Sequence, residues 1–231
     1  MALQEFGSGL WLAEGAAVNG AAGFVYPTRM AVLRLADGGL VLWSPVQLTG
    51  DLRAEVAGLG PVRALVAPNR LHHLFLGDWA AAFPGAAILA APGLAAKRPD
   101  LRIAAELGEA APAGWAGQIE TRLVPNTIAP EVVLFHRGSE AVLVCDLLQN
   151  LPADWFHGWR ALVARLDLML EDEPTMPRKF RLAVRGAGPR EALRAVLDWP
   201  AERVVVAHGT PVAAGGRALL RRAFGGVAGL S

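Results

Sequence analysis

Three of the five histidines and one aspartate of this chain follow short apolar segments that have the character of buried strands. When a strand feeds a polar loop, the loop lies at the carboxyl end of that strand, where α/β proteins usually build their sites. We therefore expect the four side chains to meet at one edge of the sheet structure. They are His72, His73, Asp146 and His208.

The first third of the chain predicts an antiparallel start followed by a helix. A first strand is expected over 9–15, and Asp37-Gly38 between the apolar segments 30–36 and 39–44 is typical of a β-hairpin turn. Thr49 has the hydroxyl that caps a helix, which predicts a helix over 51–57 that ends at Gly58 or Gly60.

The rest of the chain alternates further strands with helices. Residues 62–67 predict a buried strand, and a helix reaching Phe83 is expected after the histidine loop. The segments 86–91, 118–124, 131–136 and 141–145 look like a second set of strands. Helices are expected over 155–168 and 189–197, with a connection over 171–185 between them, and the chain closes with a strand over 203–207 and a helix.

The composition favours one folded domain over residues 1–231. The chain is 53% hydrophobic and 19% charged, which suits a large α/β core and argues against a disordered or coiled-coil protein. Lys and Arg (22) nearly balance Asp and Glu (21), so no overall charge favours nucleic acid or an anionic membrane. The expected partner is a small-molecule substrate, and the oligomeric state is not readable.

The N-terminal residues and the cysteine content favour a cytoplasmic protein. The first residues have neither a basic stretch nor a long apolar stretch, so no secretory signal is visible. The single Cys145 excludes an internal disulfide framework and is interpreted as a core residue.

Imidazole and carboxylate groups that converge from separate strands are what a zinc or iron site requires. By spacing alone, however, each of these residues is more often a hydrogen-bonded structural residue than a ligand. The competing interpretation is therefore a polar cluster without a metal, in which Arg70 neutralises Asp146 and a histidine hydrogen-bonds to it.

The loop from Pro68 to His73 resembles the H-x-H-x-D-H motif of the metallo-β-lactamase superfamily, with the same strand before it and helix after it. In that register, Pro68 and Arg70 replace the first two histidines, His72 replaces the aspartate, and His73 is the last histidine. Asn126 or Thr127 stands where the superfamily has a third histidine.

The later motifs of the superfamily also occur in order. Leu143–Asp146 is similar to the strand that ends in the metal-bridging aspartate, and Val205–Gly209 is similar to the closing Ser/Ala-His-Gly. More narrowly, Asn69–Gly77, Trp43–Pro45 and Arg203–Gly209 resemble an uncharacterised branch known only as a domain of unknown function. The resemblance implies a four-layer αββα sandwich of the α/β class.

The departures from the motifs imply at most one metal ion. Every ligand exclusive to the first metal of the superfamily is replaced, so that site is expected to be empty. The second set remains if His72 substitutes for the aspartate, giving His72, His73, Asp146 and His208 as ligands of one Zn²⁺ or Fe²⁺. Arg70, if it points inward, would take the place of the missing metal and act with Asp146 in catalysis.

Two functions therefore compete. The first is a mononuclear metal-dependent hydrolase acting on a small ester, thioester or lactone, although four protein ligands would close a tetrahedral site. The second is a non-catalytic descendant that has lost the metal and serves as a binding or interaction module. The basic run Pro177–Arg181 could form a lip for an anionic substrate, but short charge runs are usually solvated faces.

Overall fold

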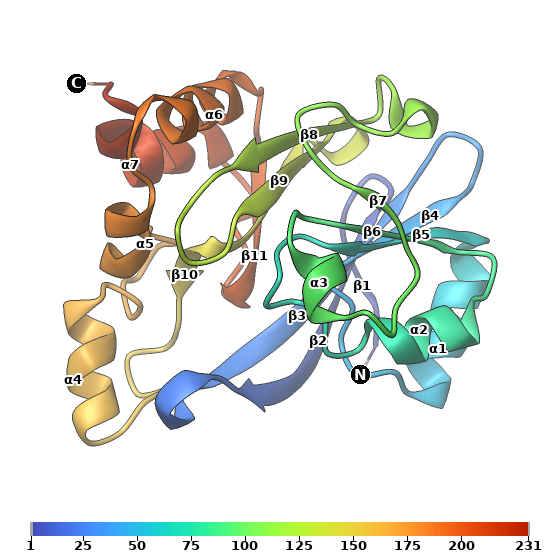
Figure 1. Ribbon diagram of the computed structural model, residues 1–231, viewed down its shortest axis with the longest axis horizontal. Helices are drawn as coiled ribbons and strands as arrows, with labels where there is room; N and C mark the ends of the chain where they lie inside the picture. The colour runs from blue at the N-terminus through green and yellow to red at the C-terminus, as the bar shows by residue number, and fades with distance from the viewer. Residues whose placement is uncertain (1, 231) are drawn as a thin grey trace.

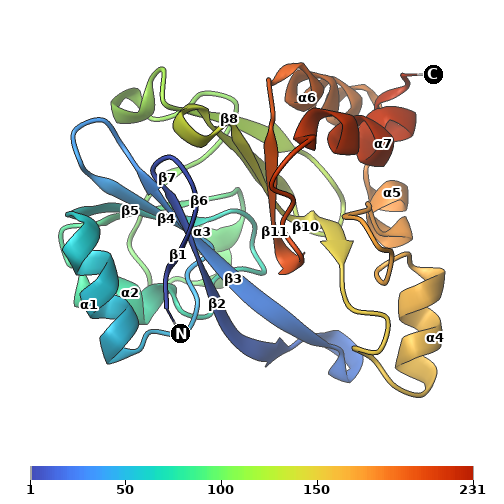
Figure 2. The same cartoon turned by 180° about the vertical axis from the view of Figure 1, so that it is seen from behind.

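The computed structural model describes residues 2–230 and consists of two β-sheets packed face to face between two layers of helices (Figures 1 and 2). The larger sheet has seven strands in sequence order from β1 to β7, and the smaller sheet has the order β11-β10-β9-β8. This is the αββα sandwich that the sequence resemblance implies. No helix among the described residues is long and apolar enough to cross a membrane.

The larger sheet begins antiparallel and becomes parallel after β4. Its strands are β1 (Gln4–Gly7), β2 (Leu10–Asn19), β3 (Val25–Arg34), β4 (Leu40–Trp43), β5 (Val62–Ala67), β6 (Ala87–Ala90) and β7 (Ile103–Glu106). The predicted turn at Asp37-Gly38 is confirmed, since it joins β3 to β4. The segment that contains β6 was predicted to belong to the second set of strands, but β6 pairs with β5 in the first sheet.

The smaller sheet consists of β8 (Ile119–Val124), β9 (Glu131–His136), β10 (Ala141–Asn150) and β11 (Arg203–Gly209). Strand β9 pairs with β10 only as far as Leu143, and the register of β10 against β11 shifts between Val144 and Gln149. The second half of β10 therefore departs from regular pairing at the point where Asp146 lies.

Most helices cover the outer faces of the sheets, whereas α4 packs against Phe24 at the end of the β2–β3 hairpin. They are α1 (Gly50–Leu59), α2 (Leu76–Ala82), α3 (Leu94–Lys97), α4 (Trp159–Leu166), α5 (Arg178–Ala183), α6 (Ala187–Asp198) and α7 (Gly216–Ala228). The predicted cap of α1 is confirmed: Thr49 Oγ1 accepts a hydrogen bond from the backbone N–H of Leu52, and the helix ends at Gly60. Helix α5 lies in the segment predicted to be only a connection.

Three apolar layers hold the sheets and most helices together, and a smaller fourth cluster holds α4 against Phe24. One lies between the two sheets and contains Trp43, Leu143 and Cys145, so the prediction of a core cysteine is confirmed. A second joins the larger sheet to α1 and α2, and the third joins the smaller sheet to α5, α6 and α7. The loops after β4 and β5 and the ends of β10 and β11 meet at one edge of this frame.

Candidate metal centre

His72 is held by a local turn in the loop that follows β5. The side-chain oxygen of Asn69 accepts hydrogen bonds from the backbone N–H groups of Leu71 and His72, which bends the loop back on itself. Nδ1 of His72 lies 2.8 Å from Oγ of Ser44, the residue that follows β4. The other ring nitrogen, Nε2, is therefore left to face the neighbouring site residues.

His208 is fixed in one tautomer by a backbone carbonyl. Its Nδ1 lies 2.7 Å from the carbonyl oxygen of Pro27, so Nδ1 donates its proton there and Nε2 of the neutral ring carries the lone pair. This is the arrangement in which proteins usually hold a metal-binding histidine. The next residue must be glycine, because Gly209 has a φ of 136° and an added Cβ would lie 2.1 Å from Asn150 Oδ1.

Asp146 is positioned by a buried carboxyl group on the neighbouring strand. Glu131 accepts hydrogen bonds from the backbone N–H groups of Cys145, Asp146 and Leu147, at 2.7, 2.8 and 3.3 Å. It thereby replaces the strand partner that β10 loses where it departs from β9. The amide of Asn69 donates to Asp146 Oδ2 at 2.7 Å and to Glu131 at 3.2 Å, so one side chain links the His72 loop to this strand.

Three potential ligand side chains converge at this edge. Nε2 of His72 lies 3.1 Å from Nε2 of His208 and 3.5 Å from Asp146 Oδ2, while Nε2 of His208 lies 3.2 Å from Asp146 Oδ1. Ligand atoms at about 2.0–2.1 Å from a tetrahedral Zn²⁺ lie about 3.4 Å from one another. The two imidazole nitrogens and the carboxylate, whose Oδ2 faces His72 and whose Oδ1 faces His208, are therefore separated by distances close to those between ligands of one tetrahedral ion.

The electrostatics of the cluster also suit a cation. Burial lowers the pKa of His72, which favours the neutral ring that a metal needs. Burial alone would raise the pKa of Asp146, but the adjoining His72 and His208 hold that pKa well below its usual range. Burial and the charge of Asp146 raise the pKa of Glu131 to about 8. At neutral pH the negative charge of this region therefore lies on Asp146, where a positive charge would be stabilised.

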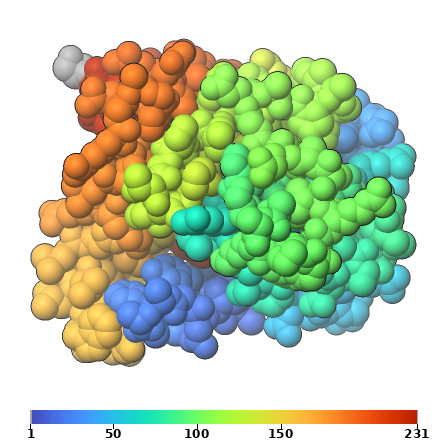
Figure 3. Space-filling view, viewed as in Figure 1, coloured from blue at the N-terminus to red at the C-terminus, as the bar shows by residue number. Residues whose placement is uncertain are grey.

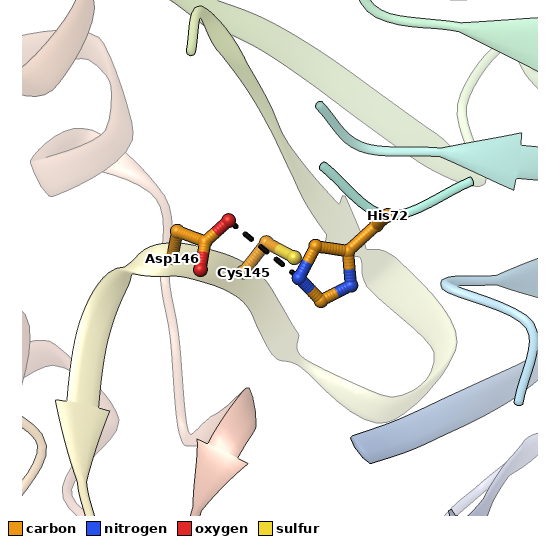
Figure 4. A group of neighbouring side chains, drawn as sticks. All are labelled: His72, Cys145 and Asp146. Atoms are coloured by element: carbon orange, nitrogen blue, oxygen red, sulfur yellow. Dashed lines mark ion pairs between the residues drawn. The ribbon is translucent and has the colours of Figure 1, made fainter. Parts of the chain in front are cut away.

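Cys145 also points toward this region. Its sulfur, a nitrogen of His72 and an oxygen of Asp146 all lie within 4.8 Å of one another. Figure 4 shows the three side chains side by side. Metal ions bind the thiolate, however, and burial raises the pKa of this thiol well above its ordinary value. His208 has the better chemistry for a third ligand, because its free ring nitrogen already faces Asp146.

The structure does not bring the predicted ligand His73 to the other three. Nδ1 of His73 lies 3.2 Å from a guanidinium nitrogen of Arg98, which also donates to the His73 carbonyl oxygen. Burial and the charges of Lys97 and Arg98 lower the pKa of His73 to about 4. The two neighbouring side chains of this tight loop point in different directions. His72 therefore reaches the cluster, whereas His73 contacts Arg98, the residue that follows α3.

Arg70 also lies elsewhere than the catalytic hypothesis requires. Its guanidinium donates to the carbonyl oxygen of Ile128 and makes no ion pair with Asp146 among the described residues. Asn126, one of the two residues predicted with Thr127 at the position of a third histidine, accepts hydrogen bonds from the backbone N–H groups of Ile128 and Ala129 in its own loop. Among the residues predicted for the site, only His72, Asp146 and His208 lie together.

Sequence reasoning missed four residues that shape this site. Ser44 and Asn69 lie within segments that carry the family resemblance but were given no role in the site. Glu131 is an acidic residue at the start of a fully buried strand, which was a visible signal. The chain's only tyrosine, Tyr26, has its ring 5.2 Å from the ring of His208. No local sequence pattern indicates that Tyr26 lies beside His208.

The cluster opens into a pocket of about 490 Å³. Tyr26, Ser44 and Gln149 line it near the three ligand atoms, and apolar side chains form much of its wall. Figure 3 shows the face on which it opens, between the end of the β2–β3 hairpin, the loop after β5 and the loop before β9. The candidate metal centre is therefore reachable by a small molecule.

Solved structures with the same architecture include metal-dependent enzymes. A metallo-β-lactamase from Pontibacter korlensis superposes with a TM-score of 0.63 at 17% identity, covering 98% of each chain. The mono-zinc form of the metallo-β-lactamase FIM-1 from Pseudomonas aeruginosa gives a TM-score of 0.62 at 13% identity, covering 99% of this chain and 93% of the other. The metal-soaked Flv1 flavodiiron core from Synechocystis sp. PCC6803 gives 0.65 at 11% identity, covering 99% of this chain and 60% of the other.

Comparison at the level of sequence identifies a family without an assigned reaction. No curated protein matches the chain. The model of a domain of unknown function, DUF4336, matches residues 11–161, which is more than half of the chain. The chain therefore belongs to the DUF4336 family, and its fold is that of the metallo-β-lactamases.

Proposed function

We propose that this protein is a mononuclear metal-dependent hydrolase in which His72, Asp146 and His208 hold one Zn²⁺ or Fe²⁺ ion. One observation carries the proposal: the two ring nitrogens and the carboxylate lie 3.1–3.5 Å apart at the base of an open pocket. His208 Nε2 carries no proton when its ring is neutral. A cation between these acceptor atoms would offset the repulsion that their close approach otherwise causes.

The number of protein ligands decides whether the site has a free position for catalysis. A set of four side chains would have closed a tetrahedral site, whereas three leave one position for a water molecule or substrate, as in catalytic zinc sites. When bound, the ion supplies Lewis acidity toward a carbonyl oxygen and lowers the pKa of a water molecule. The structure thus favours catalysis more than the four-ligand hypothesis does.

The surrounding residues orient the reacting groups. Pro27 and Ser44 hold the two imidazole rings through their Nδ1 atoms, and Asn69 binds Asp146 Oδ2. Burial, together with the charges of Asp146 and Asp167, raises the pKa of Tyr26 to about 12, so its hydroxyl stays protonated at neutral pH. Tyr26 lines the pocket and can donate a hydrogen bond to a substrate oxygen there.

The non-catalytic module remains the second candidate, and a specific observation favours it. Asp146 already has three partners without any ion: the Asn69 amide and the rings of His72 and His208. If one histidine carries a proton on Nε2, the cluster is satisfied as a buried polar network. An assay must therefore distinguish a catalytic metal site from a buried polar network that binds no metal.

Metal-dependent hydrolysis is the test of the proposal. The protein, reconstituted with Zn²⁺ or Fe²⁺, is assayed against p-nitrophenyl esters, thioesters and lactones. We expect turnover of at least one class, and a loss of roughly 100-fold or more in kcat/KM in His208→Ala, because a ligand to the activating ion is removed. His157→Ala, which removes an exposed histidine, is the matched control and should retain activity.

Two outcomes would contradict the hydrolase. One is an ion-loaded protein that hydrolyses none of the three classes, which supports the module. The other is hydrolysis that survives His208→Ala and a chelator unchanged, because the reaction would then arise elsewhere.

A further inference from the structure

The pocket above the metal centre has apolar walls that continue onto the surface. Leu71 and Leu74, both in the loop after β5, line it and are 43% and 54% exposed. Phe75, Ile128 and Phe180 line it as well. Exposed leucines at the mouth of an open apolar pocket indicate a ligand with an apolar body.

Two cations near the same mouth lack an acidic partner. Lys97, at the end of α3, lines the pocket, and its ammonium group donates to the backbone carbonyl of Arg70. Arg70 donates to the carbonyl of Ile128, another pocket residue. Within the described part of the chain, no carboxylate lies within 4.0 Å of either cationic group.

Two other cations near the pocket are paired with acidic residues. The Lys179 ammonium lies 2.9 Å from Asp167, and Arg98 pairs with Asp100 at 2.6 Å. Of the two lysines that line the pocket, Lys97 is therefore the one without a carboxylate partner among the described residues, and its ammonium group contacts the backbone of Arg70 in the loop after β5. Arg70, which does not reach Asp146, can still meet a substrate at this rim.

We infer that the substrate carries an apolar acyl group, which fills the pocket, and an anionic group, which binds Arg70 and Lys97. The anion is a phosphate or a carboxylate, both of which these two cations can bind. The identity of the reacting bond rests on the proposed function, since that function places the carbonyl at the metal centre. The binding of an anionic amphiphile depends only on the pocket and its rim.

A matched pair of dyes tests this inference without metal or turnover. The metal-free protein is titrated with 1-anilinonaphthalene-8-sulfonate and with N-phenyl-1-naphthylamine, which has the same rings but no sulfonate. We expect Arg70→Gln/Lys97→Gln to weaken sulfonate binding roughly 10-fold at low salt while leaving the neutral dye within about 2-fold. Arg217→Gln, an exposed cation on α7, should change neither.

Further variants and competitors in the same titration locate the region that binds the apolar group and identify the anion. Leu71→Ser/Leu74→Ser should weaken both dyes. Octyl phosphate and octanoate should displace the sulfonate dye better than octanol does, and the stronger of the two identifies the anion. The inference is overturned if octanol competes equally well, or if the double charge variant weakens both dyes alike or neither. These outcomes leave the metal-dependent hydrolase untouched, because no catalysis is measured.

Discussion

Glu131→Ala is expected to lower the free energy of unfolding by about 3–5 kcal/mol, because it removes the partner of several buried donors at once. The carboxyl group accepts three backbone N–H groups of β10 and the Asn69 amide. It is fully buried, so water cannot replace it without opening the structure. Such a loss is a large fraction of the stability of a typical domain, about 5–15 kcal/mol.

Chemical denaturation of the metal-free protein measures this effect separately from metal binding. Glu131→Gln keeps the shape and one acceptor oxygen, so it should cost less, about 1–2 kcal/mol. Glu109→Ala is the control: its side chain is 78% exposed, and its 3.8 Å contact with Arg122 should contribute under about 1 kcal/mol. A Glu131→Ala variant as stable as Glu109→Ala would show that Glu131 does not hold β10.

Arg29→Met is expected to destabilise the fold by about 2–4 kcal/mol and to weaken metal binding about 10–100-fold. The buried guanidinium donates to the carbonyl oxygens of Val206 and Gly209, on either side of His208. It also pairs with Glu14, whose side chain is 71% exposed. Methionine keeps the apolar stem but leaves both carbonyls without their donor, so the end of β11 should loosen.

The control for Arg29 is its exposed partner. Glu14→Gln removes the ion pair and leaves both carbonyl contacts, so stability should change by less than about 1 kcal/mol. Thermal unfolding of the metal-free proteins and a zinc titration with a competing chelator measure the two effects. If Glu14→Gln and Arg29→Met behave alike, the ion pair, and not the support of β11, explains the role of Arg29.

The sequence predicted the elements that carry strong local signals. The apolar segments that became β5 and β9 have the predicted bounds, and the capped helix α1 begins after Thr49 as expected. Short elements were missed where a charged residue interrupts the apolar pattern. Strands β1 and β7 and helix α3 have four residues each and contain Glu5, Glu106 and Lys97, whereas the equally short strands β4 and β6 are wholly apolar and were predicted. Their stability comes from the sheet or the loop on which they pack.

The residues of the candidate site were likewise predicted only in part. The order of motifs placed His72, Asp146 and His208 correctly at one edge, because strand ends fix where their loops can reach. The directions of His73 and Arg70 could not be predicted, because they depend on Arg98 and Ile128, which lie 25 and 58 residues away. Arg29 contacts residues 177 and 180 positions along the chain, and no local pattern predicts such a contact.

The central claim is that three side chains, and not His73, hold one ion. The most direct measurement is the metal content of the reconstituted wild type, His72→Ala and His73→Ala after removal of free Zn²⁺ or Fe²⁺. The account predicts about one equivalent in the wild type and in His73→Ala, and under about 0.1 equivalents in His72→Ala. Less than about 0.1 equivalents in the wild type, or a loss of the ion in His73→Ala with retention in His72→Ala, would contradict it.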